Sequence, residues 1–168
     1  EFHALEALSS IYGVDISEDN IIGGTPGHEV ACRPRLLGIM EMWHSKVLHQ
    51  ELDSASQFLA SAKWIVDHNM IIGNMLSKDS DGKSTNRESM PIFEYKWKPE
   101  GHQVELLATS LGDIMAEAEE GQSDVLSLFG PQPPELIWQG LYSDIFKAPS
   151  RAQVQLTGRR TSNSRGTK

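Results

Sequence analysis

The sequence predicts an α/β or α+β fold, a small compact core in which helices pack on a sheet. Two local patterns predict this class. Apolar residues recur every three or four positions between residues 34 and 52, as on one face of a helix. Between residues 91 and 99 they alternate with polar residues, as in a half-buried strand. Because both kinds of segment interleave along 168 residues, helices layered on one sheet are the simplest way to bury both.

The first half of the chain carries the helical patterns. Apolar residues at three-residue spacing predict a short helix from His3 to Tyr12, which Gly13 can end. A second helix is expected to start at Pro34, and its apolar stripe comprises Leu36, Met40, Trp43 and Val47. Asp53 suits the cap of a third helix, whose buried face comprises Phe58, Leu59, Ala62, Ile65 and Val66.

Strand patterns follow. The apolar run in residues 69–76 predicts a short buried strand. In residues 91–99, one face of the predicted strand consists of Phe93, Tyr95 and Trp97, and the opposite face carries Glu94, Lys96 and Lys98. Residues 102–110 fit either a strand or the start of a helix, and the spacing in 111–118 favours a helix up to Gly121.

Three prolines, at positions 131, 133 and 134, predict a domain boundary, because proline donates no backbone hydrogen bond and keeps the preceding residue extended. We therefore expect a folded core in residues 1–129, serving as a protein–protein interaction module, and a flexible basic tail in 130–168. An incipient helix is predicted in 135–147. About twelve residues are marginal for an isolated helix, so we expect it to form on a partner through Ile137, Trp138, Leu141, Tyr142 and Ile145.

Charge is distributed unevenly. Residues 130–168 hold six cations and two anions, whereas residues 1–129 hold nine cations and 21 anions, so the tail is +4 and the body −12. Such asymmetry favours contact with a polyanion or an acidic protein surface. The predicted RNA-binding residues are Lys147, Arg151, Arg159, Arg160, Arg165 and Lys168. Trp138 and Tyr142 suit either stacking on bases or packing in a protein groove.

The sequence carries no signature of a nucleotide-binding loop or a catalytic nucleophile, so we expect no enzyme activity, cofactor, bound metal or small-molecule substrate. No apolar run approaches the roughly 20 residues of a membrane helix. Cys32 is the one cysteine and forms no internal disulfide. The alternative of a small metal-dependent enzyme rests on Glu41, His44 and His49. It is disfavoured because the pattern contains a single Glu-x-x-His pair.

The size, the boundary at Phe129–Gly130 and the basic tail resemble the small assembly and packaging protein of the cystoviruses, enveloped double-stranded RNA bacteriophages. The resemblance implies a non-enzymatic component of the viral polymerase complex that supports capsid assembly and genome packaging. Its partners would be viral RNA, the capsid shell protein and the polymerase complex. It would be located in the virion and in the cytoplasm of the infected host cell. The resemblance also implies a homodimeric core similar to BRCT domains.

Two functions therefore stay open from the sequence. One is an assembly factor that contacts RNA through its basic tail. The other is a protein–protein adaptor whose tail helix docks on a partner and which binds no nucleic acid.

Overall fold

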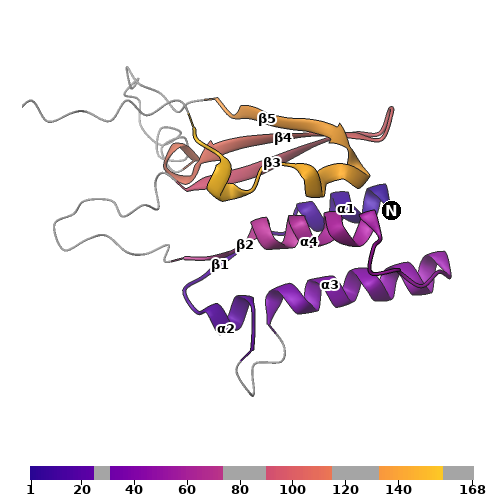
Figure 1. Cartoon of the computed structure of the whole chain (residues 1–168). Helices are drawn as coiled ribbons and strands as arrows, with labels where there is room; N and C mark the ends of the chain where they lie inside the picture. The colour runs from indigo at the N-terminus through magenta and orange to yellow at the C-terminus, as the bar shows by residue number, and fades with distance from the viewer. Residues whose placement is uncertain (25–30, 74–89, 115–132, 157–168) are drawn as a thin grey trace, which may run out of the picture.

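The computed structural model describes residues 1–24, 31–73, 90–114 and 133–156 and shows a layered arrangement of helices and sheet (Figure 1). Helices α1 (Phe2–Ser9) and α4 (Gln57–Asn69) lie at one level, between a three-stranded sheet and helix α3 (Cys32–Trp43). The short helix α2 (Glu18–Ile21) precedes α3. The predicted mixed α/β class is confirmed, and α1 agrees with the helix predicted from His3 to Tyr12.

The main sheet has the strand order β3–β4–β5, with both pairs antiparallel. Strand β3 (Pro91–Lys98) confirms the predicted alternation: Phe93 is 1% exposed, while Glu94 and Lys96 on the other face are exposed. The ambiguous segment is strand β4 (Gln103–Ser110). It lies in the centre of the sheet, where hydrogen bonding to both neighbours satisfies its backbone. The chain is helical in 111–114, and the rest of that predicted helix lies outside the described residues.

The predicted helix in 135–147 is wrong. The chain instead forms strand β5 (Glu135–Leu141), paired with β4, and then a 3₁₀ helix, η2 (Tyr142–Lys147). A two-sided β4 needs a partner on each edge, and the hydrogen bonds of that ladder outweigh a marginal local helix. Gly140 fits this pairing, because a Cβ there would lie 2.5 Å from the Trp138 ring. Glycine also disfavours a helix interior, so Gly140 further explains why this segment is not a helix.

The predicted boundary after residue 129 is also wrong, because the chain returns to the core beyond it. Ile145 in η2 is 1% exposed and belongs to the same buried cluster as Phe58 and Leu106. A further 3₁₀ turn, η3 (Arg151–Gln153), follows. The segment 135–156 is thus part of the folded unit, and the tail predicted for 130–168 can apply only to residues beyond 156, which lie outside the described residues.

A second, small sheet joins two distant segments. Strand β1 (Gly13–Asp15) pairs in parallel with β2 (Met70–Ile72), which lies within the run predicted as a buried strand. Met70 and Ile71 are 2% and 5% exposed. This pairing and a hydrogen bond from the Tyr12 hydroxyl to the Phe93 carbonyl (2.7 Å) attach the end of α1 to both sheets.

The helices begin and end differently from the predictions. Helix α3 continues as a π-helix, η1 (His44–Leu48), and Val47 in it is 55% exposed, so the predicted stripe is buried only in part. Helix α4 is capped by Ser56, whose hydroxyl accepts from the Leu59 amide at 3.5 Å. Asp53, the predicted cap, instead accepts from the Ala55 amide in the preceding turn (3.0 Å).

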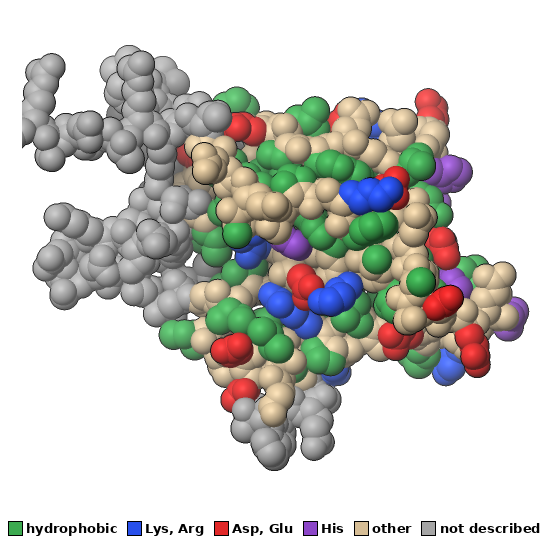
Figure 2. Space-filling model, in the orientation of Figure 1, with side chains coloured by type: hydrophobic (Ala, Val, Ile, Leu, Met, Phe, Trp, Pro, Cys, Tyr) green, Lys and Arg blue, Asp and Glu red, His purple; other side chains and the backbone are tan. Residues whose placement is uncertain are grey.

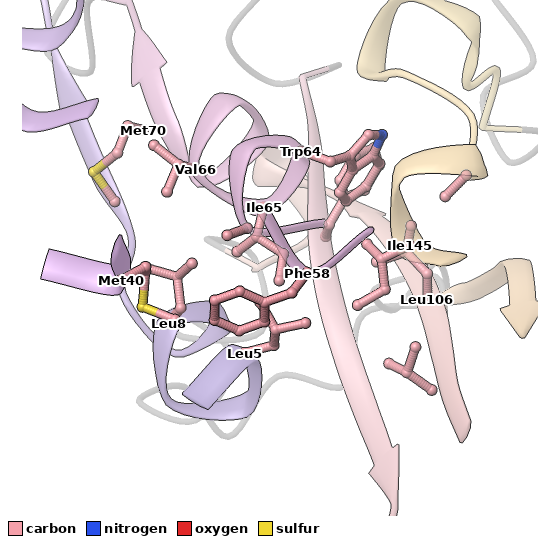
Figure 3. Close-up of a cluster of buried hydrophobic side chains, with 14 of the residues drawn as sticks. Leu5, Leu8, Met40, Phe58, Trp64, Ile65, Val66, Met70, Leu106 and Ile145 are labelled. Atoms are coloured by element: carbon pink, nitrogen blue, oxygen red, sulfur yellow. The ribbon is translucent and has the colours of Figure 1, made fainter. Parts of the chain in front are cut away.

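The core surrounds α4. Met40 of α3 points toward Leu8 of α1 and Phe58 of α4, and Leu106 and Ile145 lie on the other side of this cluster (Figure 3). The predicted α4 face is confirmed at Phe58, Ala62, Ile65 and Val66, each at most 2% exposed. Because α4 is covered by α1, α3, η2 and the sheet, it is the element on which the other layers assemble.

Candidate functional site

An apolar groove lies between α1 and α3 and has a volume of about 390 Å³. Its α1 wall comprises His3, Ala4, Ala7, Leu8 and Ile11. Its α3 wall comprises Leu36, Ile39, Met40 and Trp43. We call this feature the α1–α3 groove. Its volume is within the range of sites that hold small ligands or the side chains of a docked peptide.

Periodicity explains why these residues share one surface. The α1 positions 3, 4, 7 and 8 and the α3 positions 36, 39, 40 and 43 each follow the spacing of one helical face, and Ile11 comes just after the end of α1. Leu8 and Met40 form the buried base, at 3% and 6% exposure, while Ile11 and Ile39 at the rim are 44% and 51% exposed. A contiguous apolar surface that no described residue covers is typical of an interaction site.

Buried polar contacts hold the α1 wall in place. The Asn69 side-chain amide donates to the Ser9 carbonyl at 2.9 Å, and the Trp97 indole donates to the Ser9 hydroxyl at 2.9 Å. Tyr95 donates to the Asn69 side-chain oxygen at 3.0 Å, and burial raises the pKa of its hydroxyl well above the usual value, so it stays a donor. The end of α1 is therefore fixed to α4 and β3, and the groove is pre-formed.

The charges at the groove rim differ between its two walls. Arg35 of α3 and Lys46 of η1 are exposed, and neither forms an ion pair within the described ranges. On α1, His3 and Glu6 lie 2.9 Å apart, so this carboxylate already has a partner. The α3 side of the rim is thus basic and available, whereas the α1 side carries a paired acid.

The metal-site alternative gains no support from the geometry. His44 is 3% exposed, with its Nδ1 3.0 Å from the Gln50 carbonyl and its Nε2 3.1 Å from a Glu1 carboxylate oxygen. Both ring nitrogens thus have partners, which indicates a structural role. Among the residues that the structure describes, no three His, Cys, Asp or Glu side chains group as metal ligands, so Glu41, His44 and His49 do not form such a group.

Of the predicted RNA-binding residues, two lie within the described ranges. Lys147 is exposed and forms an ion pair with Asp144 at 2.7 Å. Arg151 is packed inward: its guanidinium donates to the His68 carbonyl and lies 5.8 Å from the centre of the Phe93 ring. Burial lowers the pKa of Arg151 to about 10. Arg151 is therefore a structural residue, contrary to the prediction. Arg159, Arg160, Arg165 and Lys168 lie outside the described residues.

Arg151 and Arg33 have a clear structural task at the end of α4. Arg33 donates to the carbonyls of Asp67 (2.9 Å) and Met70 (2.7 Å), while Arg151 binds that of His68. The last carbonyls of a helix lack partners within the helix and carry partial negative charge, so two guanidinium groups stabilise this end. The sequence gives no local signal for this convergence, because the two arginines are 118 positions apart.

The predicted partner-binding residues are mostly used inside the fold. Ile145 is buried, and Ile137, Trp138 and Tyr142 pack against the core. Leu141 is 49% exposed, but it is on the sheet and not on a helix face. The prediction of one docking stripe from these five residues is therefore wrong, because strand geometry sends alternate residues to opposite faces.

The α1–α3 groove was not foreseen from the sequence. A partial signal was present: Ile39 and Met42 are large apolar residues outside the predicted stripe of the second helix. Their exposure, at 51% and 49%, shows a second apolar surface on α3. On the face shown in Figure 2, Lys and Arg side chains lie near Asp and Glu side chains and form no broad basic surface.

Comparison with protein families, curated proteins and solved structures finds no match to this chain. The resemblance to cystoviral assembly proteins thus stays a prediction, and the likeness to BRCT domains is not confirmed. Within the described ranges, no helix has the length and apolar character needed to span a membrane.

Proposed function

We propose that this chain is a non-enzymatic docking protein of a larger assembly, and that the α1–α3 groove is its protein-binding site. The observation that carries this proposal is the pre-formed apolar groove of about 390 Å³ with Ile11 and Ile39 exposed at its rim. Covering a half-exposed large apolar side chain contributes roughly 1 kcal/mol. Ile11 and Ile39 together thus supply about 2 kcal/mol toward binding.

A viral particle is the setting that the resemblance suggests for this function. In that setting, the docked partners would be the shell protein and other components of the polymerase complex, in the virion and the cytoplasm of the infected host cell. This part of the proposal rests on the resemblance alone. The boundary that helped to carry the resemblance does not hold, since β5 and η2 complete the core.

The docking function is tested by cross-linking the chain to its partners in the cells that produce it. Three forms are compared: the unchanged chain, Ile39→Glu in the groove, and Ile16→Glu as a control at another exposed site, where the side chain is 69% exposed. We expect Ile39→Glu to lose a cross-linked partner that Ile16→Glu retains. A partner set that is identical in all three forms would contradict the proposal.

A second candidate function, contact with RNA, is favoured by the charge of residues 157–168. This stretch contains Arg159, Arg160, Arg165 and Lys168 and no acidic residue, while the remaining 156 residues carry a net charge of −12. An acidic body repels RNA, so contact would be confined to this stretch. Because Arg151 is engaged with α4 and Lys147 is paired with Asp144, the candidate RNA contact comprises these four cations.

This candidate is tested by the salt dependence of binding to single-stranded RNA. Each cation that contacts phosphate adds about 0.7 to the log–log slope, so replacing the four terminal cations with glutamine should flatten the slope by up to about 3. Substitution is preferable to truncation at Ser150, because truncation also removes η3. Arg151→Gln is the control and should leave the slope unchanged. If Arg151→Gln flattens the slope and the replacement of the four terminal cations does not, these four cations are excluded as the RNA contact.

A further inference from the structure

We propose that the α1–α3 groove binds a short amphipathic helix of a partner protein, and that the flank of this helix facing α3 is acidic. This inference rests on the proposed docking function and specifies the partner. Three features support the inference: the length of the groove, the incomplete helix layer beside α3, and the charges at the rim of the groove.

The groove has the length of two helical turns. Its α3 wall runs from Leu36 to Trp43 and its α1 wall from His3 to Ile11. At 1.5 Å per residue, the α3 wall is about 11 Å long. A docked helix would therefore place three apolar anchors at i, i+4 and i+7 in the groove.

The occupant completes a layer of the fold. Helices α1 and α4 lie side by side beneath the sheet, and α3, with the short α2 before it, lies on their outer side (Figure 1). Helix α3 covers Phe58 of α4, at 2% exposure, but no element among the described residues covers the outer face of α1, where Ala7 is exposed. A second helix beside α3 would cover this face. The small side chains of Ala4 and Ala7 permit the interaxial distance of about 8–10 Å at which helices pack.

The rim determines the charge of the occupant. Arg35 is four residues before Ile39, and Lys46 is four residues after Met42, so these residues form one stripe of α3 and its π-helical extension. Glutamates or aspartates on the facing flank of a docked helix would pair with both cations. Glu6 on α1 is already paired with His3, so the docked helix needs no basic side chain on that flank.

A second copy of this chain fits the groove less well. The groove is two turns long and about one helix diameter, ~10 Å, wide, so its footprint is on the order of 100 Å². A stable dimer interface buries about 800 Å² per partner. A single helical segment is the occupant that matches the size of the groove.

The test uses two synthetic 16-residue peptides with leucines at i, i+4 and i+7, one with glutamates and one with lysines on the same flank. Fluorescence anisotropy of the labelled peptides measures their affinity for the full chain at about 150 mM salt, where surface charges are partly screened. We expect the glutamate peptide to bind at least tenfold more tightly. The double variant Arg35→Glu/Lys46→Glu should reverse the preference, and the matched control Lys96→Glu/Lys147→Glu should retain it.

Two further variants locate the binding. Ala7→Trp fills the groove and should abolish binding of both peptides. Should Ala7→Trp fail to fold, as judged by circular dichroism, Ile39→Asp blocks the same groove from an exposed position. Binding that survives both blocks overturns the inference.

The remaining outcomes separate this inference from the docking function. Equal affinity for the two peptides, with binding blocked by Ala7→Trp, overturns the acidic flank and leaves docking intact. Self-association that Ile39→Asp abolishes, without peptide binding, overturns the inference in favour of a second copy. Absence of both peptide binding and self-association overturns the inference, and the cross-linking experiment then decides the docking function independently.

Discussion

The sealed core around α4 and the open α1–α3 groove are built from similar residues but differ in how completely they are covered. Around α4, Ala62 and Ile65 have no exposed surface. In the groove, Ile39 is 51% exposed and Ile11 is 44% exposed. The two regions share α1 and α3 as walls, so they lie less than one helix diameter apart.

This difference separates stability from function within one small fold. Burial of apolar surface at α4 from every side supplies the driving force for folding. The groove retains apolar surface in contact with water, which costs stability and is typical of a surface reserved for a partner. Substitutions in the two regions should therefore affect different properties, and paired substitutions can separate them.

The largest effect is expected from Ile65→Ala. This substitution leaves a cavity beneath fully covered residues and should lower the free energy of unfolding by about 2–5 kcal/mol. The matched substitution Ile39→Ala, in the groove, should change it by less than about 0.5 kcal/mol. Urea denaturation monitored by tryptophan fluorescence measures both values. Equal losses would show that the groove is as important for folding as the core.

A somewhat smaller effect is expected from Arg151→Met. The substitution removes a charged hydrogen bond to the His68 carbonyl, and it also removes a buried Nε that has no partner. The net loss of stability should be about 1–2 kcal/mol, because the charged hydrogen bond is the larger contribution. Lys147→Met removes an exposed ion pair and should change stability by less than about 0.5 kcal/mol. Chemical denaturation measures the stability of both variants, and equal losses of stability would refute this prediction.

Filling experiments compare the two regions directly. Ala62→Leu adds atoms to a site with no free space and should cost about 1–3 kcal/mol. Ala7→Leu adds the same atoms at the groove, where there is room, and should alter stability by less than about 1 kcal/mol. Thermal unfolding measures the difference. An equally large loss for Ala7→Leu would mean that the groove is closed in solution.

The smallest effect concerns pH. Burial lowers the pKa of His68, and Arg151 and Arg33 act in the same direction, while the Trp64 carbonyl and Asp67 oppose them. Below about pH 6.5 the unfolded chain therefore binds more protons than the folded chain. The contribution of His68 is fully present above that pH and is lost as the pH falls toward the lowered pKa.

The rings of His68 and Trp64 stack with their centroids 3.9 Å apart. His68→Phe keeps a ring at this position and removes the titratable group. Urea unfolding between pH 7 and 5 should show a shallower decline in stability for His68→Phe than for the unchanged chain. Identical pH profiles for His68→Phe and the unchanged chain would exclude His68 as the cause.

The sequence alone determined the elements whose pattern is local. The alternation of Phe93, Tyr95 and Trp97 defines β3 and its buried face, and the spacing of Phe58, Ala62 and Ile65 defines the buried face of α4. These two predictions are correct because the repeat of a strand or a helix depends on only a few neighbouring residues. The negative body and the cationic end were likewise readable from composition.

The conformation of residues 135–147 and the location of the groove depend on tertiary packing. Ile137, Leu141 and Ile145 have helical spacing, yet pairing with β4 makes the first part of this segment a strand, because a long-range ladder satisfies more backbone groups than a short isolated helix. The groove arises because α3 covers α4 and leaves α1 open. That depends on how three helices pack, which no local pattern of residues encodes.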